Sequence, residues 1–259
     1  MGGLFHKLRH PRRCYVVCAI PRSGSNLLTD GLHATRRAGR PKQFFLRKSE
    51  SDFATAHNLD LSAGFAAYVR DIITATATSN EVFGFKLMSW YLDDFLDRLR
   101  GTGAFGNAGT TDLELLRNAF PRLKFVHVLR RHKVRQALSK ARAHQTGLWK
   151  VQEGKTVQGE PQFDVELIEQ CLEESEQQEK LWERFFQRIE IDPLRVEYEN
   201  LCEDYEANIH RVLDFLQISL PRCTRIGPPV TVRQADDISR AWEERFLAER
   251  TVSESLVRT

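Results

Sequence analysis

The sequence predicts an α/β protein with a P-loop-like three-layer fold, in which a central parallel sheet is flanked by helices. Short β-rich segments alternate along the chain with longer segments of helical periodicity. This alternation favours a parallel sheet, because each helix crosses back over the sheet to the start of the next strand. A tight polar loop also joins the first predicted strand to the first predicted helix, which is where α/β folds commonly bind anions.

The predicted strands and helices follow one another with loops between them. The strands lie at 15–20, 82–88, 125–129 and 194–198. The first is a continuous apolar run, which is typical of a strand that is buried on both faces. Helical spacing of apolar residues predicts helices at 26–34, 61–76, 90–99, a short one after Asp112, and further ones at 133–146, 164–189, 205–216 and 236–249.

Composition bounds the organisation of the chain. Its 259 residues are 41% apolar and 28% charged, which suffices for one core and a polar surface. We predict a basic N-terminal tail over 1–13, a single domain over 14–250 and a C-terminal tail over 251–259. We expect a cytoplasmic protein, because the sequence contains no apolar run near the roughly 20 residues that span a bilayer and no signal-peptide core.

Charge and cysteine content exclude several classes of function. A net charge of +3 creates no field that would draw the chain onto nucleic acid, so we expect no nucleic-acid partner. The basic residues gather instead at 7–13, 36–48 and 130–142, which fits a small polyanionic ligand. The five cysteines are odd in number and include no C-x-x-C pair. We therefore expect neither a disulfide framework nor a metal site.

The loop at 21–26 has the composition of an anion-binding turn. Gly24 allows a tight turn and a close approach of backbone N–H groups to a ligand. These N–H groups and the dipole of the following helix favour a phosphate at this point. Ser23 and Ser25 add hydroxyl donors, and Arg22 adds a forked cationic donor.

The same loop lacks the features of two common nucleotide-binding motifs. A Walker A loop has two glycines flanking four residues and ends in Lys-Ser or Lys-Thr, and a dinucleotide fold has G-x-G-x-x-G. Neither pattern is present at 21–26. A nucleotide kinase is therefore kept as an alternative and is not favoured.

Several segments in a fixed order show a family resemblance. They are 21–28 (PRSGSNLL), 39–45 (GRPKQFF), 83–88 (FGFKLM) and 129–139 (LRRHKVRQALS), which continues through 142–146 to Trp149, with weaker matches at 197–201 and 233–236. Through them the chain resembles the Stf0-type sulfotransferases, a bacterial group that includes enzymes acting on trehalose. The resemblance implies a sulfotransferase-like fold and transfer of a sulfuryl group from 3′-phosphoadenosine 5′-phosphosulfate (PAPS), leaving PAP, to an alcohol, without a metal.

The resemblance also implies roles for individual residues. The donor's 5′-phosphosulfate falls to the first loop, that is to Arg22, Ser23, Gly24, Ser25 and Asn26. Family members bind the 3′-phosphate with an Arg and a Ser eight residues later. Arg131 and Ser139 have that spacing here, with Arg130 adjacent. Sulfuryl transfer needs cations near the transferred group, and we place Arg22 and Lys86 there.

The general base is where this sequence departs from the family. In the trehalose-sulfating members, the segment that matches 41–45 carries a Glu where this chain has Gln43. An amide can orient a hydroxyl but cannot accept its proton. The remaining candidates are His33 and His144, whose side-chain type titrates near neutrality, and two carboxylates, Glu50 and Asp52.

The acceptor is predicted only by class. We expect Gln43, Phe45 and Trp149 to contact it, because aromatic rings stack on sugar faces. A small or lipid-linked carbohydrate fits this expectation, the latter at a membrane surface beside the basic N-terminus, and family precedent includes homodimers. Three functions stay open: a PAPS-dependent sulfotransferase, a non-catalytic PAPS- or PAP-binding protein motivated by Gln43, and the nucleotide kinase.

Overall fold

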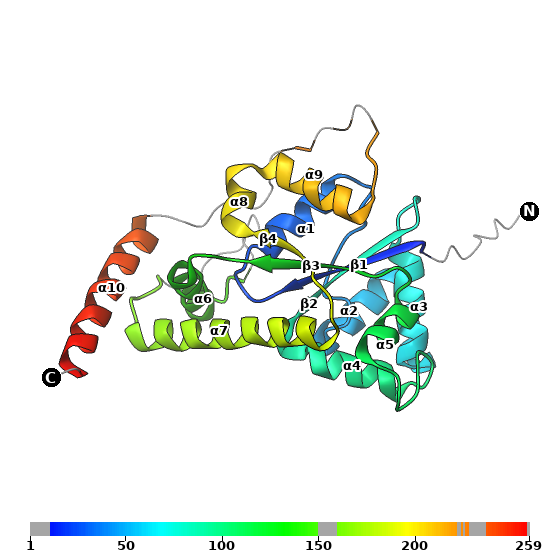
Figure 1. The fold of residues 1–259 in the computed structure, drawn as a ribbon, viewed down its shortest axis with the longest axis horizontal. Helices are drawn as coiled ribbons and strands as arrows, with labels where there is room; N and C mark the ends of the chain where they lie inside the picture. The colour runs from blue at the N-terminus through cyan, green and yellow to red at the C-terminus, as the bar shows by residue number, and fades with distance from the viewer. Residues whose placement is uncertain (1–10, 150–159, 222–223, 225, 228–236, 258–259) are drawn as a thin grey trace, which may run out of the picture.

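A four-stranded parallel sheet forms the centre of the molecule (Figure 1). The computed structural model describes residues 11–149, 160–221, 224, 226–227 and 237–257. The strands are β1 (Arg13–Ala19), β2 (Val82–Met88), β3 (Lys124–Leu129) and β4 (Leu194–Glu197), in the order β2-β1-β3-β4. Each neighbouring pair is parallel, so all four carboxyl ends meet at one edge of the sheet.

Helices connect the strands, as crossover connections in a parallel sheet require. Among the described helices, three have a first turn capped by a side chain typical of that position: Thr111, Asp164 and Asp204. The helices are α1 (Ser25–Ala34), α2 (Arg47–His57), α3 (Phe65–Thr76), α4 (Leu92–Gly101), α5 (Asp112–Ala119), α6 (Lys133–Thr146), α7 (Val165–Arg188), α8 (Tyr198–Glu203), α9 (Tyr205–Leu216) and α10 (Asp237–Val257), with 3₁₀ turns at Leu61–Ala63 and Ser89–Tyr91.

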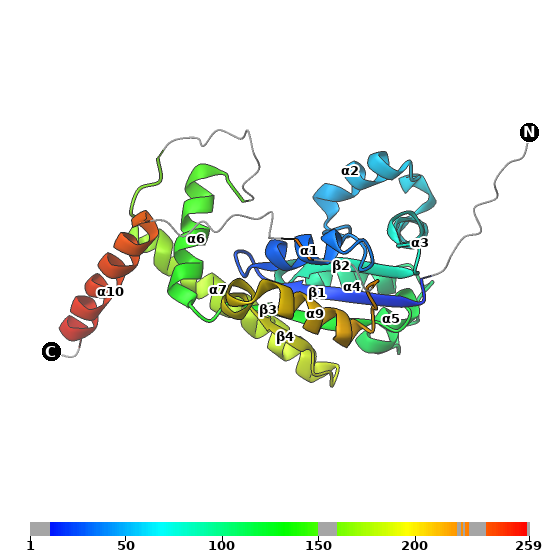
Figure 2. The ribbon, with the colours of Figure 1, turned by 90° about the horizontal axis from the view of Figure 1, so that it is seen from above.

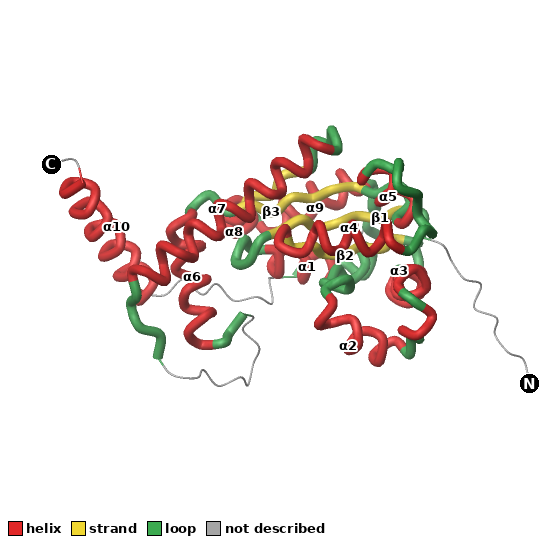
Figure 3. The backbone as a smooth tube through the Cα atoms, turned by 90° about the horizontal axis from the view of Figure 1, so that it is seen from below, coloured by secondary structure: helices red, strands yellow, loops and turns green. Residues whose placement is uncertain are grey.

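The two faces of the sheet belong to separate apolar clusters. Successive side chains of a strand point to opposite faces. In β1, Tyr15 and Val17 pack with α1, α8 and α9, whereas Val16 and Cys18 pack with α3, α4, α5 and α7. Figure 1 shows α8 and α9 above the strands and α7 below them, and Figures 2 and 3 show the same sheet from above and from below. The result is three layers with the sheet in the middle.

α6 and α10 lie together beyond the carboxyl ends of the strands (Figure 1). They form a third apolar cluster in which Trp242 and Phe246 of α10 pack against Ala137, Leu138 and Ala141 of α6. This position places α6 beside the loop that follows β1. A functional site at the carboxyl edge is the usual arrangement in open α/β sheets.

The predicted fold class is confirmed, and three boundaries are corrected. β1 already begins at Arg13, within the predicted tail, because its backbone N–H donates to the Glu81 carbonyl oxygen at the edge of β2. The predicted helix over 61–76 is a 3₁₀ turn and α3, separated at Gly64, whose φ is +88°. The last helix, predicted over 236–249, runs on to Val257 as α10, into the segment predicted as a C-terminal tail. Residues 1–10 lie outside the described residues.

Candidate active site

The loop between β1 and α1 has a backbone shape that its sequence makes possible. Arg22 and Gly24 both have positive φ values, 61° and 93°. A side chain at position 24 would overlap the ring of Tyr198, which packs directly over this glycine. Glycine is therefore required twice, for its conformation and for the close contact. The loop delivers the chain to Ser25, where α1 begins and its free N–H groups face the carboxyl edge of the sheet.

Arg22 joins this loop to α6. Its Nε donates to Ser139 Oγ at 2.9 Å, and its Nη1 donates to the Trp149 carbonyl oxygen at 2.7 Å. Gln136, one turn before Ser139, donates from Nε2 to the Pro21 carbonyl oxygen at 2.9 Å. The loop is therefore held against one face of α6 by contacts that span more than 100 residues of sequence.

A second arginine crowds the first. Arg130, at the end of β3, donates from Nη1 to the Arg22 carbonyl oxygen at 3.2 Å, and its guanidinium lies 4.6 Å from the centre of the Tyr198 ring. Burial, and then the charge of Arg130, lower the pKa of Arg22 to about 10. Burial also lowers the pKa of Arg130. Two largely buried cations side by side favour the binding of an anion.

Some buried polar atoms at this loop have no hydrogen-bond partner within the part of the chain that the structure describes. They are Ser23 Oγ, Arg130 Nε and Gln136 Oε1. A buried polar atom without a partner costs about 1–3 kcal/mol, so each has free energy to gain from a ligand. The two donors, on Ser23 and Arg130, fit the oxygens of a phosphate or sulfate group.

Lys86 reaches the same loop from β2. Its Nζ donates to Asn26 Oδ1 at 2.7 Å, and the residue is only 5% exposed. Its backbone N–H donates to the Lys42 carbonyl oxygen at 2.9 Å, which ties the segment around Gln43 to the edge of the sheet. Gln43 therefore lies beside Lys86 in the fold, although the two are 43 positions apart in the sequence.

Arg131 faces away from the loop. Its Nε lies 3.1 Å from Glu197 Oε2, and its Nη2 donates to Asn200 Oδ1 at 2.9 Å. The backbone N–H groups of Arg131 and His132 both donate to the Glu199 carboxylate. Burial acts to raise the pKa of Glu199, but these hydrogen bonds lower it overall. Of the two adjacent arginines, the structure brings Arg130 to Arg22.

The two histidine candidates lie in different places. His33 is in the last turn of α1, about 12 Å along the helix from its first residue at 1.5 Å per residue. A general base needs hydrogen-bond reach to its proton, so the structure does not support His33 in that role. His144, near the end of α6, lies edge-on to the Trp149 ring with centroids 4.8 Å apart. The Trp149 carbonyl oxygen in turn accepts from Arg22.

The expectation that Phe45 contacts an acceptor is wrong for this structure. Phe45 is 0% exposed and lies in a cluster of aromatic rings that includes Phe85 and Phe95. The ring fills the core below α2 and has no surface to offer. Trp149, by contrast, is 44% exposed beside His144, and Gln43 is partly exposed.

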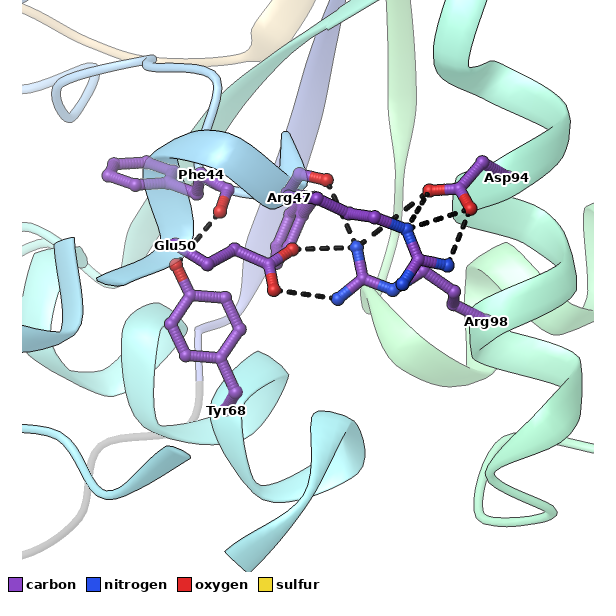
Figure 4. A network of polar contacts seen from close by, with 7 residues as sticks. Phe44, Arg47, Glu50, Tyr68, Asp94 and Arg98 are labelled. Carbon is purple, nitrogen blue, oxygen red and sulfur yellow. Dashed lines mark hydrogen bonds and ion pairs between the residues drawn. The ribbon is translucent and has the colours of Figure 1, made fainter. Parts of the chain in front are cut away.

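The carboxylate candidates also differ from the expectation. Glu50 forms a two-point ion pair with Arg98, at 2.6 and 2.7 Å, and both side chains are largely buried (Figure 4). The ion pair occupies both carboxylate oxygens of Glu50 and serves the contact of α2 with α4. Asp52 is exposed on α2.

Sequence reasoning missed two residues that the structure places at the loop. Tyr198 packs over Gly24, and the Arg130 guanidinium lies over the Tyr198 ring. Its position at the end of β4 was a signal, because residues at the carboxyl ends of parallel strands converge. Gln136 lies three residues before Ser139, on the same side of α6. Helical spacing from Ser139 would have indicated it.

Among the residues that the structure describes, nowhere do three or more His, Cys, Asp or Glu side chains gather as metal ligands would. None of their helices has the length and apolar character needed to cross a membrane.

Comparison with known proteins places the whole of this site within one family match. The Stf0 sulphotransferase family model matches residues 14–249. The trehalose 2-sulfotransferases of Mycobacterium tuberculosis (strain ATCC 35801 / TMC 107 / Erdman) and Mycolicibacterium smegmatis are 28% and 29% identical to this chain, and each alignment covers 92% of this chain and 95% of the relative. A solved structure, the sulfotransferase domain of the Synechococcus PCC 7002 olefin synthase, has a TM-score of 0.43 at 15% identity, covering 93% of this chain and 96% of that one. Because the family match spans most of its length, this chain belongs to the Stf0 sulphotransferase family and is a sulfotransferase.

Proposed function

We propose that the protein transfers a sulfuryl group from PAPS to a hydroxyl of a carbohydrate or glycoconjugate. The observation that carries this proposal is the contact of Arg22 Nε with Ser139 Oγ at 2.9 Å, with Arg130 beside Arg22. It joins the β1–α1 loop to α6 and concentrates positive charge between them. PAPS has anionic groups at both its 5′ and 3′ positions, and such a site would stabilise both.

We assign the two ends of the donor to the two sides of this contact. The 5′-phosphosulfate is assigned to residues 22–26, where Ser23 and the first N–H groups of α1 are available. The 3′-phosphate is assigned to Ser139 and Arg130, whose Nε has no hydrogen-bond partner among the described residues. Arg131 is assigned instead to holding Glu197 and Asn200 at the start of α8.

The reaction itself places modest demands on the protein. The acceptor oxygen attacks sulfur in line as the bond from sulfur to the bridging phosphate oxygen breaks, and PAP leaves with the electron pair. Arg22 and Lys86 are the cations that would stabilise the charge on that oxygen. Positioning of donor and acceptor contributes the rest, as in phosphoryl transfer.

His144 is our candidate for the base that takes the acceptor's proton. It neighbours Trp149, which connects to Arg22, and an imidazole ordinarily titrates near neutrality. Glu174 lies near the same face of α6: its pKa is lowered chiefly by the hydrogen bond from Lys140 and in part by His144. A carboxylate near an imidazole stabilises the protonated form that proton transfer creates. Gln43, beside Lys86, would orient the acceptor hydroxyl.

The acceptor is proposed from the relatives. Both are trehalose 2-sulfotransferases by name, which supports a small carbohydrate. Gln43 in place of the expected Glu favours a different acceptor or a different path for the proton. A lipid-linked acceptor, a homodimer and a cytoplasmic location stay predictions from the sequence. Family membership favours sulfuryl transfer over the kinase and over binding without catalysis.

Calorimetric titration with PAP, with AMP and ATP as controls, tests the donor site. We expect a clear preference for PAP, since AMP and ATP lack the 3′-phosphate. Arg130→Ala should weaken PAP binding by about 2 kcal/mol, the scale of a hydrogen bond to a charged group. Arg131→Ala, the matched variant, removes the same charge one residue away and should weaken it much less. Equal binding of PAP and AMP by the wild type would refute the assigned 3′-phosphate site.

Transfer of sulfur-35 from labelled PAPS to a panel of sugars, including trehalose, tests the reaction. We expect label in at least one sugar and PAP in equal amount. PAP binding without labelling of any sugar would contradict the proposed acceptor class.

A further inference from the structure

The turn from β3 into α6 is held by a side chain from α8. His132, the residue before the first turn of α6, makes no capping hydrogen bond with its own side chain. The two oxygens of the Glu199 carboxylate accept instead from the backbone N–H groups of Arg131, at 3.0 Å, and of His132, at 3.1 Å. Backbone N–H groups at the start of a helix lack partners within that helix, and an anion beside them is stabilising. Glu199 therefore caps α6 from a distant part of the sequence.

This cap also restrains the residue before it. Arg130 directly follows β3, and the peptide unit that contains the Arg130 carbonyl also contains the Arg131 N–H. Because a peptide unit is planar, holding that N–H restricts the backbone on one side of the Arg130 Cα atom. The pairing of Leu129 with Glu197 in β4 restricts the other side. The direction in which the Arg130 side chain leaves the turn is thereby set, and it leads to the Arg22 carbonyl oxygen at 3.2 Å.

Tyr198, the residue before Glu199, holds the other end of Arg130. The Arg130 guanidinium lies 4.6 Å from the centre of the Tyr198 ring, and a cation over an aromatic face is attracted to it. The same ring packs over Gly24 in the β1–α1 loop. The start of α8 thus acts on Arg130 at two points, with Tyr198 at its guanidinium and Glu199 at the backbone that follows it.

We propose that Glu199 is a positioning residue for the donor, which orients Arg130 toward the 3′-phosphate through the backbone at Arg131 and His132. This inference rests on the proposed donor site, where that phosphate is assigned to Arg130 and Ser139. Glu199 does not contact the nucleotide in this role. It contributes to specificity, because only a nucleotide with a 3′-phosphate gains from an oriented Arg130.

The charge of Glu199 makes this role testable by the sign of an effect. Burial acts to raise the pKa of Glu199, but the hydrogen bonds from the two backbone N–H groups lower it overall, so the carboxylate is charged at neutral pH. An anion near an arginine that binds phosphate opposes PAP by charge alone. Loss of Glu199 should therefore tighten PAP binding if charge dominates, and weaken it if the orientation of Arg130 dominates. We expect weaker binding.

Calorimetric titration of the full chain with PAP and with AMP measures the effect. Glu199→Ala should weaken PAP binding about tenfold and AMP binding less than twofold, because AMP has no 3′-phosphate to contact Arg130. Glu199→Gln keeps one acceptor oxygen, so it should weaken PAP binding less than Glu199→Ala does. Glu203→Ala, the matched control, removes the same charge from the exposed end of α8 and should leave both affinities unchanged. Thermal melting of each variant reports folding.

A double-mutant cycle shows whether Glu199 acts through Arg130. The Arg130→Ala background has no guanidinium to orient, so adding Glu199→Ala should change PAP affinity less than twofold. Arg131→Ala is the contrasting background, because both backbone N–H groups still reach Glu199 there. Adding Glu199→Ala to it should weaken PAP binding about tenfold, as in the wild type. A tenfold loss in the Arg130→Ala background would overturn the inference, since Glu199 would then act on another part of the site.

The outcomes separate this inference from the proposal beneath it. Wild-type protein that binds PAP no better than AMP overturns both. Where the wild type prefers PAP, unchanged or tighter PAP binding in Glu199→Ala overturns the inference alone. Equal losses for PAP and AMP overturn it too, because they indicate a structural role. If Glu199→Ala does not fold, Glu199→Gln carries the same comparison, and PAP binding that this variant leaves unchanged overturns the inference.

Discussion

Arginine side chains are buried in two regions of this protein, and their neighbours differ. Between α2 and α4, Arg98 is matched by the two oxygens of Glu50, and the nearby Arg47 by Asp94 (Figure 4). At the β1–α1 loop, the Arg22 side chain donates to a hydroxyl and to a carbonyl oxygen, and after burial the charge of Arg130 lowers its pKa most. In the first region each arginine lies against a carboxylate. In the second region two arginines lie next to one another.

The two regions show how an arginine that stabilises the fold differs from an arginine that binds an anion. A buried ion pair is costly to break because the remaining charge is left without its partner. Clustered like charges instead cost stability until an anion arrives, and the free energy of binding offsets that cost. Arg98 and Arg22 are both arginines with little exposed surface, so the sign of the neighbouring charge is what distinguishes them.

The largest expected effect concerns a buried base on β3. His127 on β3 is 1% exposed; burial, and then the charges of Arg195 and Lys133, lower its pKa from 6.5 to about 3. The folded protein then binds fewer protons than the unfolded chain, so the free energy of unfolding falls as pH falls from 6.5 toward 3. At about 1.4 kcal/mol per pH unit, the loss is about 4–5 kcal/mol.

His127→Leu should remove most of this slope in denaturant titrations at a series of pH values. His210→Leu, a change at an exposed histidine of α9, should keep the wild-type slope. An unchanged slope in His127→Leu would mean that His127 is not the buried base that resists acid.

The ion pair in the α2–α4 region gives the next effect. Glu50→Ala leaves Arg98 largely buried without its carboxylate partner, and we expect the free energy of unfolding to fall by about 3 kcal/mol. PAP affinity of the folded protein should stay as it is. Arg47→Ala, which breaks the neighbouring exposed pair, should change stability little. A loss of PAP affinity in Glu50→Ala at temperatures where the variant is folded would contradict the separation of the two regions.

In the loop region the expected effect is on rate. His144→Ala should lower kcat about 100-fold, equivalent to about 2.7 kcal/mol, with little change in PAP affinity. His33→Ala removes an exposed histidine from α1 and should keep the wild-type rate. Steady-state kinetics with a saturating acceptor measure both. If the rate falls in His33→Ala and not in His144→Ala, the base is His33 and the assignment is reversed.

The smallest expected effect is the sharpest test of the comparison. Arg22→Gln removes a charge that burial and Arg130 oppose, so the ligand-free protein should keep its stability or gain about 1 kcal/mol, while PAP binding falls at least tenfold. The same change at Arg98 leaves Glu50 without its cation and should destabilise the fold. Thermal unfolding of the two variants without ligand gives the comparison. Equal destabilisation would show that Arg22 is as structural as Arg98.

Much of the fold was predictable because strand composition is local. The structure has β2 at the predicted residues and the other three strands within two residues of prediction at either end. α2 was not predicted, because only Ala54 of its 11 residues is buried, and such a polar segment lacks helical periodicity. Its position depends on the contact of Arg98 with Glu50, which links residues 48 positions apart.

The sequence predicted which segments form the candidate site, but not the directions in which their side chains point. The loop at 21–26 and the end of β3 meet as expected. The spacing from Ser139 assigned the 3′-phosphate to Arg131, however, and the structure pairs Arg131 with Glu197 and Asn200. Neighbouring residues at a strand end point to opposite sides, so only the structure shows that Arg130 faces the loop and Arg131 faces Glu197. Phe45 was equally suited to a sugar or to the core, and packing decided it.

The contact of Gly24 with Tyr198 has a consequence for the order of assembly. The two residues are separated by most of the chain, and contacts of such long sequence separation form slowly because loop closure precedes any gain from them. We therefore expect the loop to reach its final shape only when the segment around β4 and α8 docks. In refolding from denaturant, recovery of PAP binding should lag behind recovery of helical signal, so the nucleotide itself would report the last step of maturation.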